Sequence, residues 1–300
     1  MRHEEFWFAD GSVVLVARNT GFRVFRSLLA AQSTVFSDML SSSSPNAEEM
    51  FEGCPVVHLS DSPQDVAYFL GVLLPKSQRT LYMRNLRFSF RRVAAIIRLA
   101  HKYHVQDVLD QAILALGEYF TSDFDTWESD RIAVVLKSRH AVAVVNLARL
   151  VDRPSLLPIA LYECALLGSS VFKGYRRDEN YVDRLDQSDI LAAKAVALIS
   201  DVFVTEPCTR CERRGRCKGA LKTMLEDAIG SDDASDPDVL NGWGNTIKDW
   251  AKELRLCGPC EKAALARDTA ARRRVWDELP DIFDVKVEEW NSSVGSEDLG

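Results

Sequence analysis

Short apolar runs separated by turn residues open the chain, and helical periodicity follows them. Residues 12–17 read Ser-Val-Val-Leu-Val-Ala after an Asp-Gly turn signal, and this β-branched run predicts a strand. Residues 21–25 predict its hairpin partner, and residues 55–59 predict a further short strand. Apolar residues at helical spacing predict a helix over 27–40. The first third is therefore expected to combine a small sheet with helices.

The rest of the chain has the periodicity of helices. Ser62 followed by Pro63 predicts a helix start, because proline suits the first helical position. Apolar stripes at i, i+3, i+4 and i+7 predict further helices, at 90–103, 108–120, 129–151, 155–168 and 188–204. A last helix is expected from about Glu261 to Leu279, ending at Pro280. The expected fold class is α+β, with a mostly α-helical C-terminal region.

The charge balance and the lengths of the apolar runs argue against some classes of protein. The 44 acidic residues exceed the 37 basic ones, which argues against a protein that coats nucleic acid over its whole surface. No apolar run approaches the ~18 residues that span a bilayer, so no membrane partner is expected. The N-terminus carries acidic residues where a signal peptide is apolar. We expect an intracellular protein, in the nucleus, the cytoplasm or both.

Five of the seven cysteines lie close together, in the spacing Cys208-x2-Cys211-x5-Cys217 followed by Cys257-x2-Cys260. Two C-x2-C pairs can supply four thiolates to one structural zinc ion, which predicts Cys208, Cys211, Cys257 and Cys260 as ligands. Unligated thiols, or a disulfide between the two turns, are the alternatives. Cys217 is either an alternative ligand or a free thiol. Clustered cysteines in an intracellular chain favour a metal or thiol site over a disulfide framework.

Other chemistry-bearing residues have ordinary structural interpretations. Cys54 and Cys164 are expected to be ordinary residues. The tryptophans of the cysteine region are expected in the core, and these are Trp243, Trp250 and Trp276. The arginine-rich run over 267–274 is expected to be a solvated helix face, with an anionic partner as the alternative. No phosphate-binding, zinc-protease or serine-hydrolase motif occurs, so the chain is not expected to be an enzyme.

One pattern in the first third is specific, F-x-V-x-R-x-x-L-A-x-x-S-x-x-F-x-x-M. It is formed by Phe22, Val24, Arg26, Leu29, Ala30, Ser33, Phe36 and Met39. Val56-Val-His-Leu-Ser-Asp61 and Leu99-Ala-His-Lys-Tyr-His104 supply later pieces in order. Over about residues 6 to 120 the chain resembles a BTB/POZ domain. Its C-terminal part is similar to fungal BTB-containing proteins at 155–162, at 275–283 and in the paired cysteines.

The resemblance implies an arrangement of domains. A BTB/POZ domain is expected over 1–122, and a helical BACK-like region over 123–204. A helical region with the C-x2-C pairs is expected over 205–290, containing a solvated loop at 231–238. Residues 291–300 are expected to be a disordered tail.

The resemblance also implies a role in protein interaction, because family members bury an apolar face by forming homodimers. Phe6, Trp7 and Phe8 are expected at the dimer interface, and capping of their own core is the alternative. Cullin-3, as a ubiquitin ligase scaffold, or a transcriptional corepressor are the implied partners. The other hypothesis is a transcriptional regulator that contacts DNA through the basic turn from Cys208 to Cys217, which resembles half of a binuclear zinc-cluster motif.

Overall fold

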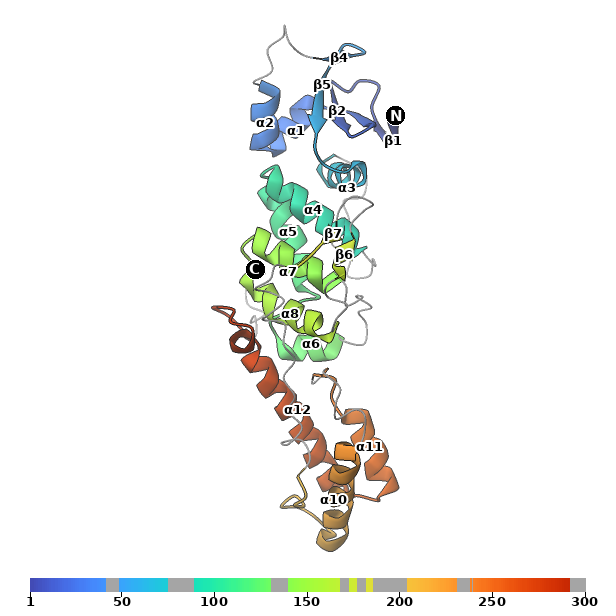
Figure 1. Ribbon diagram of the computed structural model, residues 1–300, viewed down its shortest axis with the longest axis vertical. Coiled ribbons are helices and arrows are strands. Elements are labelled where there is room, and N and C mark those ends of the chain that lie inside the picture. The colour runs from blue at the N-terminus through green and yellow to red at the C-terminus, as the bar shows by residue number, and fades with distance from the viewer. Residues whose placement is uncertain are drawn as a thin grey trace, which may run out of the picture. The chain divides into compact units, whose positions relative to one another are not determined.

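The computed structural model describes residues 1–41, 49–74, 89–130, 140–167, 173–176, 182–185, 204–230, 238 and 240–291. These residues form the helices and strands drawn in Figure 1. They divide into two compact units. The first is Met1–Phe120 with Arg149–Asp152, and the second is Thr121–Ala148 with Arg153–Gly300. The helix predicted near 188–204, the loop at 231–238 and the tail at 291–300 lie outside the described residues, except for one residue of each.

The first unit contains a five-stranded sheet in the order β1-β3-β2-β5-β4. Its strands are β1 (Arg2–Trp7), β2 (Val13–Ala17), β3 (Thr20–Val24), β4 (Met50–Phe51) and β5 (Cys54–Leu59). The β2–β3 hairpin is antiparallel, whereas β1 pairs with β3 and β5 pairs with β2 in parallel. The strands predicted at 12–17, 21–25 and 55–59 are confirmed, and β1 and β4 are additions to the prediction.

Five helices accompany the sheet, namely α1 (Arg26–Gln32), α2 (Thr34–Ser41), α3 (Pro63–Leu73), α4 (Phe90–Lys102) and α5 (Gln106–Gly117). The start at Pro63 is confirmed, with the Ser62 hydroxyl accepting the N–H of Asp65 at 3.1 Å. The single helix predicted over 27–40 is wrong, because Ser33 has extended backbone between α1 and α2. Its buried hydroxyl accepts the N–H of Phe36 and donates to the carbonyl of Tyr103.

Tyr103 contacts several of the segments that carry the sequence motifs of the first unit. Its ring stacks on Phe36 with centroids 4.4 Å apart and on Phe69 at 5.8 Å. The phenol donates to Asp61, which also accepts from Lys102. Burial, and then the hydrogen bond to Asp61, raise the pKa of Tyr103 well above its ordinary value. Segments far apart in sequence therefore meet at one buried side chain.

Helices dominate the chain after residue 120. They are α6 (Phe124–Asp130), α7 (His140–Leu150), the 3-10 turn η1 (Pro154–Leu156), α8 (Leu157–Leu166), α10 (Arg214–Gly230), α11 (Gly244–Glu253) and α12 (Gly258–Ile282). Two short strands, β6 (Tyr175–Arg176) and β7 (Val182–Asp183), form a separate ribbon. The structure therefore confirms an α+β N-terminal part followed by a helical region.

The long helix α12 runs past the residue that was expected to end it. Pro280 lies inside the last turn and has no N–H to donate to the carbonyl of Trp276. The indole N–H of Trp290 donates to that carbonyl instead, at 2.8 Å. The helix therefore ends two residues beyond the predicted end at Pro280, because a side chain from beyond the helix replaces the lost hydrogen bond.

Tryptophans fill the core around α12. The ring of Trp276 is fully buried and packs against Phe124, Trp127 and Trp290, with centroids 5.2–5.7 Å away. This confirms the core position expected for Trp276. The two other tryptophans of the cysteine region, Trp243 and Trp250, are half-buried and pack against the core of α10, α11 and α12.

A buried ion network lies on the same helix. Arg272 donates to Asp268 at 3.1 Å and to both carboxylate oxygens of Glu128 on α6. The other oxygen of Asp268 accepts a hydrogen bond from the backbone N–H of Trp243 at 2.9 Å. Arg272 and Asp268 are only 6% and 1% exposed, so the expectation of a solvated face over the whole arginine run is wrong at Arg272.

Gly11 and Gly117 form a matched pair for testing how tightly the first unit packs. A Cβ at Gly11 would lie 2.8 Å from Cγ of Arg23 and 3.0 Å from its carbonyl carbon, whereas a Cβ at Gly117 meets nothing within 4 Å. We expect Gly11→Ala to lower the free energy of unfolding by about 1–3 kcal/mol. Gly117→Ala should be neutral or stabilise by up to about 1 kcal/mol. Urea denaturation of the full chain measures both, and equal effects would contradict the packing described here.

Candidate metal centre and interaction surface

Five cysteines from three elements meet in the second unit. Cys208 and Cys211 lie on the loop before α10, and Cys217 lies in the first turns of that helix. Cys257 is the N-cap of α12, and Cys260 lies in its first turn. The residues between the two pairs fold back as helices, so the tertiary structure brings together thiols that are about 50 positions apart.

Each C-x2-C pair occupies a turn. The N–H of Cys211 donates to the carbonyl of Cys208 at 3.1 Å, and the N–H of Cys260 donates to that of Cys257 at 3.0 Å. Pro259 fits the first turn of α12 because its missing N–H has no helical acceptor there. Both sulfurs of each pair therefore point toward the same cluster.

Four of the sulfurs have the spacing of a metal site. The Sγ atoms of Cys211, Cys217, Cys257 and Cys260 all lie within 4.8 Å of one another. A tetrahedron with zinc–sulfur bonds of ~2.3 Å places its sulfurs ~3.8 Å apart. The separation of 3.9 Å between Cys211 and Cys257 is close to that value. These four thiols can therefore hold a metal ion, and soft sulfur ligands suit zinc.

The positions of Cys208 and Cys217 in the cluster differ from those expected. Cys217, expected to be a spare residue, is fully buried among the other thiols. Cys208, expected to be a ligand, is half-buried at the rim, with its Sγ 3.6 Å from that of Cys260. All five cysteines are free thiols, since their separations far exceed the ~2.05 Å of a disulfide bond.

The environment of the thiols differs along the cluster. Burial raises the pKa of Cys217 and of Cys260. Burial acts in the same direction on Cys257, but hydrogen bonds from the backbone N–H groups of Glu212 and Cys260 outweigh it and lower the pKa of Cys257 to about 7. The start of α12 therefore favours a thiolate at Cys257, which is the form that binds a metal.

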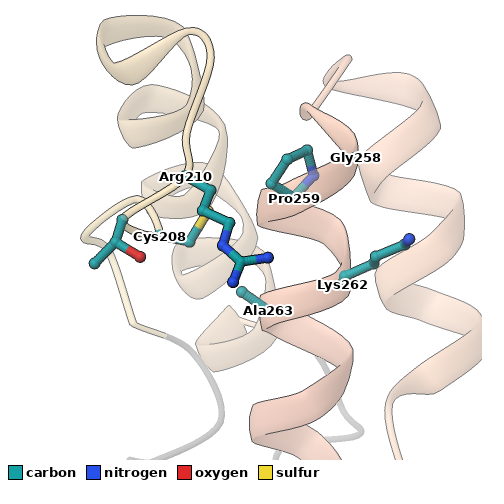
Figure 2. Close-up of a pocket in the computed structure, with 7 residues that line it drawn as sticks. Cys208, Arg210, Gly258, Pro259, Lys262 and Ala263 are labelled. Carbon is teal, nitrogen blue, oxygen red and sulfur yellow. The ribbon is translucent and has the colours of Figure 1, made fainter.

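An open pocket of about 390 Å³ lies beside the cluster, between the cysteine loop and the start of α12. Figure 2 shows Cys208 and Arg210 on the loop, facing Pro259 and Ala263 on the helix. Thr209, Gly258 and Lys262 complete its lining. Cys208 is the one thiol of the five that reaches this pocket.

The three aromatic residues near the N-terminus have different environments. Phe6 is 1% exposed and lies in the core of its own unit, near Phe22. Trp7 is half-buried beneath the guanidinium of Arg2, and Phe8 packs on Phe25 with centroids 5.0 Å apart. Phe6 is thus buried within its own unit, while Trp7 and Phe8 are partly accessible.

Trp7 belongs to an exposed apolar surface that sequence patterns did not reveal. The hairpin turn at Glu52 and Gly53 has positive φ at both residues, as a two-residue turn requires. This turn places Phe51 edge-on to Trp7, with centroids 6.0 Å apart. We call Trp7 and Phe51 the aromatic edge, and Phe51 is 43% exposed.

Within the described residues, no helix combines the length and the apolar character needed to cross a membrane. Comparison with curated proteins gives no match to this chain. Residues 8–118 match the family model of the BTB/POZ domain. The match covers the sheet from β2 to β5 and all five helices of the first unit, and it confirms the resemblance seen in the sequence.

Proposed function

Since residues 8–118 are a BTB/POZ domain, a family of interaction domains, we propose that this chain is a non-catalytic interaction protein. It self-associates through its N-terminal unit and recruits a second protein. The family match is the observation that carries the proposal.

Self-association is supported by the edge of the sheet. β1 is the terminal strand and pairs with β3 alone among the described strands. An edge strand offers unpaired N–H and C=O groups to another chain. The aromatic edge lies beside it and adds apolar surface that a second copy can cover. Phe6 contributes to such an interface only if β1 is exchanged between copies, whereas Trp7 and Phe8 contribute from the surface.

For the recruited protein, the family resemblance favours a cullin-3 ubiquitin ligase scaffold or a transcriptional corepressor. Co-purification of cullin-3 with the full chain separates these two partners. DNA contact through the basic turn after Cys208 has less support. A binuclear zinc cluster needs six cysteines, whereas this cluster has five, drawn from both ends of a helical segment.

We further propose that one structural zinc ion holds the C-terminal helices together. Its ligands are Cys211, Cys217, Cys257 and Cys260, whose sulfurs are mutually within 4.8 Å. The alternative set replaces Cys217 by Cys208. The zinc site links the loop before α10 to the start of α12, and thereby fixes a helical module that can present a second binding surface.

The self-association proposal predicts that the full chain is a dimer at micromolar concentration. Trp7→Ser should raise the dimer dissociation constant roughly 10-fold or more, because tryptophans contribute strongly to interface energy. Leu114→Ser is the control, since Leu114 is 70% exposed on α5 and belongs to no strand of the sheet. Sedimentation velocity measures the oligomer, and circular dichroism checks that the variants fold. A monomeric wild-type chain, or equal dissociation of both variants, would contradict the proposal.

A further inference from the structure

The cysteine cluster contains one thiol more than a tetrahedral metal site uses. Four sulfurs are mutually close, and the fifth, that of Cys208, approaches Cys260 at 3.6 Å. Cys208 and Cys211 are both half-buried, but Cys208 alone of the five cysteines lines the open pocket beside α12. A surplus thiol beside a metal ligand and open to solvent calls for a chemical explanation.

We propose that Cys208 is an oxidation site through which a hydroperoxide releases the metal ion. Oxidation of Cys208 leads to a disulfide with Cys260, which removes Cys260 from the metal. This inference rests on the proposed zinc site. In this proposal a small oxidant enters the pocket beside α12, and oxidation regulates a metal site that otherwise has a structural role.

Accessibility selects Cys208 as the thiol that reacts first. Cys217, Cys257 and Cys260 are 0%, 5% and 1% exposed, so a dissolved oxidant does not reach them directly. Cys211 is half-buried like Cys208, but it does not line the pocket and belongs to the four close sulfurs proposed to hold the ion. The pocket of about 390 Å³ is large enough for a hydroperoxide, and Cys208, Arg210 and Pro259 are among the residues that line it (Figure 2). Oxidation is selective for exposed thiols in this way.

Proximity selects Cys260 as the partner. Closing the 3.6 Å gap to disulfide length requires the two sulfurs to approach by about 1.5 Å, a shift within the reach of side-chain rotation. Cys208 lies on a loop at the open pocket, so its side chain has room to make that movement. The pair between Cys211 and Cys257 is wider, at 3.9 Å, and neither of its cysteines lines the pocket.

The chemistry balances in two steps. The Cys208 sulfur attacks the peroxide O–O bond and takes one oxygen, giving sulfenic acid and an alcohol, or water when the oxidant is hydrogen peroxide. The Cys260 thiolate then attacks the sulfenic sulfur, forming the S–S bond and expelling hydroxide. Two thiols lose two electrons in total, and the peroxide gains them. A dithiol reductant reverses the change.

The oxidised centre retains a covalent link between the same elements. With Cys260 in a disulfide, three thiolates remain for the ion, and its affinity falls. The disulfide joins the cysteine loop to the first turn of α12, which is the link the ion had provided. Oxidation therefore exchanges a metal cross-link for a covalent one, and the helices keep a connection after the ion leaves.

The test uses the full chain, purified under reducing conditions without chelators and then freed of reductant. Zinc content is measured first, and hydrogen peroxide is added while a chromogenic chelator reports released zinc. Peptide mapping then identifies disulfides. We expect one zinc per chain, zinc release, and a disulfide between Cys208 and Cys260. Cys208→Ser and Cys208→Ala should keep the zinc when reduced and release it at least 10-fold more slowly. Cys54→Ser, a buried thiol in the first unit, is the control and should behave as wild type.

Each failure has a distinct meaning. Loss of zinc from both reduced Cys208 variants would make Cys208 a ligand and overturn the inference while leaving a zinc site in place. Release at the wild-type rate, or a disulfide that omits Cys208, would also overturn it. A wild-type chain without zinc would overturn the zinc proposal and metal release together, while the disulfide map would still decide whether Cys208 is the oxidation site.

Discussion

Replacing Cys257 by serine is expected to abolish zinc binding and to unfold the helices α10, α11 and α12. Cys257 is 5% exposed and its sulfur belongs to the four that lie within 4.8 Å of one another, so its loss removes a ligand that serine does not replace well. Binding of structural zinc contributes on the order of 10 kcal/mol to folding in small zinc domains. Metal analysis should fall from one zinc per chain to none, and tryptophan fluorescence should report the loss of structure around Trp243 and Trp250.

Two comparisons make this result specific to the metal. Chelation of the wild-type chain should reproduce the effect of Cys257→Ser, whereas Cys164→Ser, a buried thiol on α8, should retain zinc. Cys217→Ser should lose zinc and Cys208→Ser should keep it, because Cys217 belongs to the set of four close sulfurs. Full zinc content and an unchanged melting temperature in Cys257→Ser would refute the proposed ligand set.

Asp268→Ala is expected to lower the free energy of unfolding of the second unit by about 3–5 kcal/mol, because it removes the buried one of the two carboxylates that pair with the buried guanidinium of Arg272. One carboxylate oxygen of Asp268 accepts a hydrogen bond from Arg272, and the other accepts one from the backbone N–H of Trp243. Both losses occur in a region that water does not reach, since Asp268 is 1% exposed. Urea denaturation followed by tryptophan fluorescence measures the change.

The same pair of helices supplies a matched control. Arg273, the next residue on α12, pairs with Asp125 on α6, but the Asp125 side chain is 72% exposed. Asp125→Ala should therefore cost less than about 1 kcal/mol. If the two variants lose similar stability, burial does not strengthen the contribution of the ion network around Arg272 to stability.

Much of the first unit could be predicted from sequence because its elements follow local rules. β2 is a continuous buried β-branched run, and Ser62 followed by Pro63 marks the start of α3. β1 could not be predicted, because Arg-His-Glu-Glu has no apolar alternation and the strand depends on pairing with β3. The break at Ser33 was hidden as well, since its hydrogen bond goes to Tyr103, 70 residues away.

The candidate site was predictable to a similar degree. The C-x2-C spacing identified both turns of the cysteine cluster, because each turn is a local structure. The place of Cys217 depended on how α10 packs against the start of α12, which spacing does not encode. Likewise, the i, i+4 spacing of Asp268 and Arg272 is visible in the sequence, but the partner Glu128, 144 residues away, is not.

The indole of Trp290 makes the final turn of α12 depend on a residue that follows the helix. Pro280 leaves the carbonyl of Trp276 without a helical donor, and Trp290 supplies the missing proton while stacking on the Trp276 ring. Asn291 adds a hydrogen bond from its N–H to the carbonyl of Ser122, ahead of α6. Shortening the chain to the end of α12 would therefore remove the contacts that Trp290 and Asn291 make with the tryptophan core and with the residues before α6. A truncated protein meant for crystallisation or binding assays should extend through residue 291.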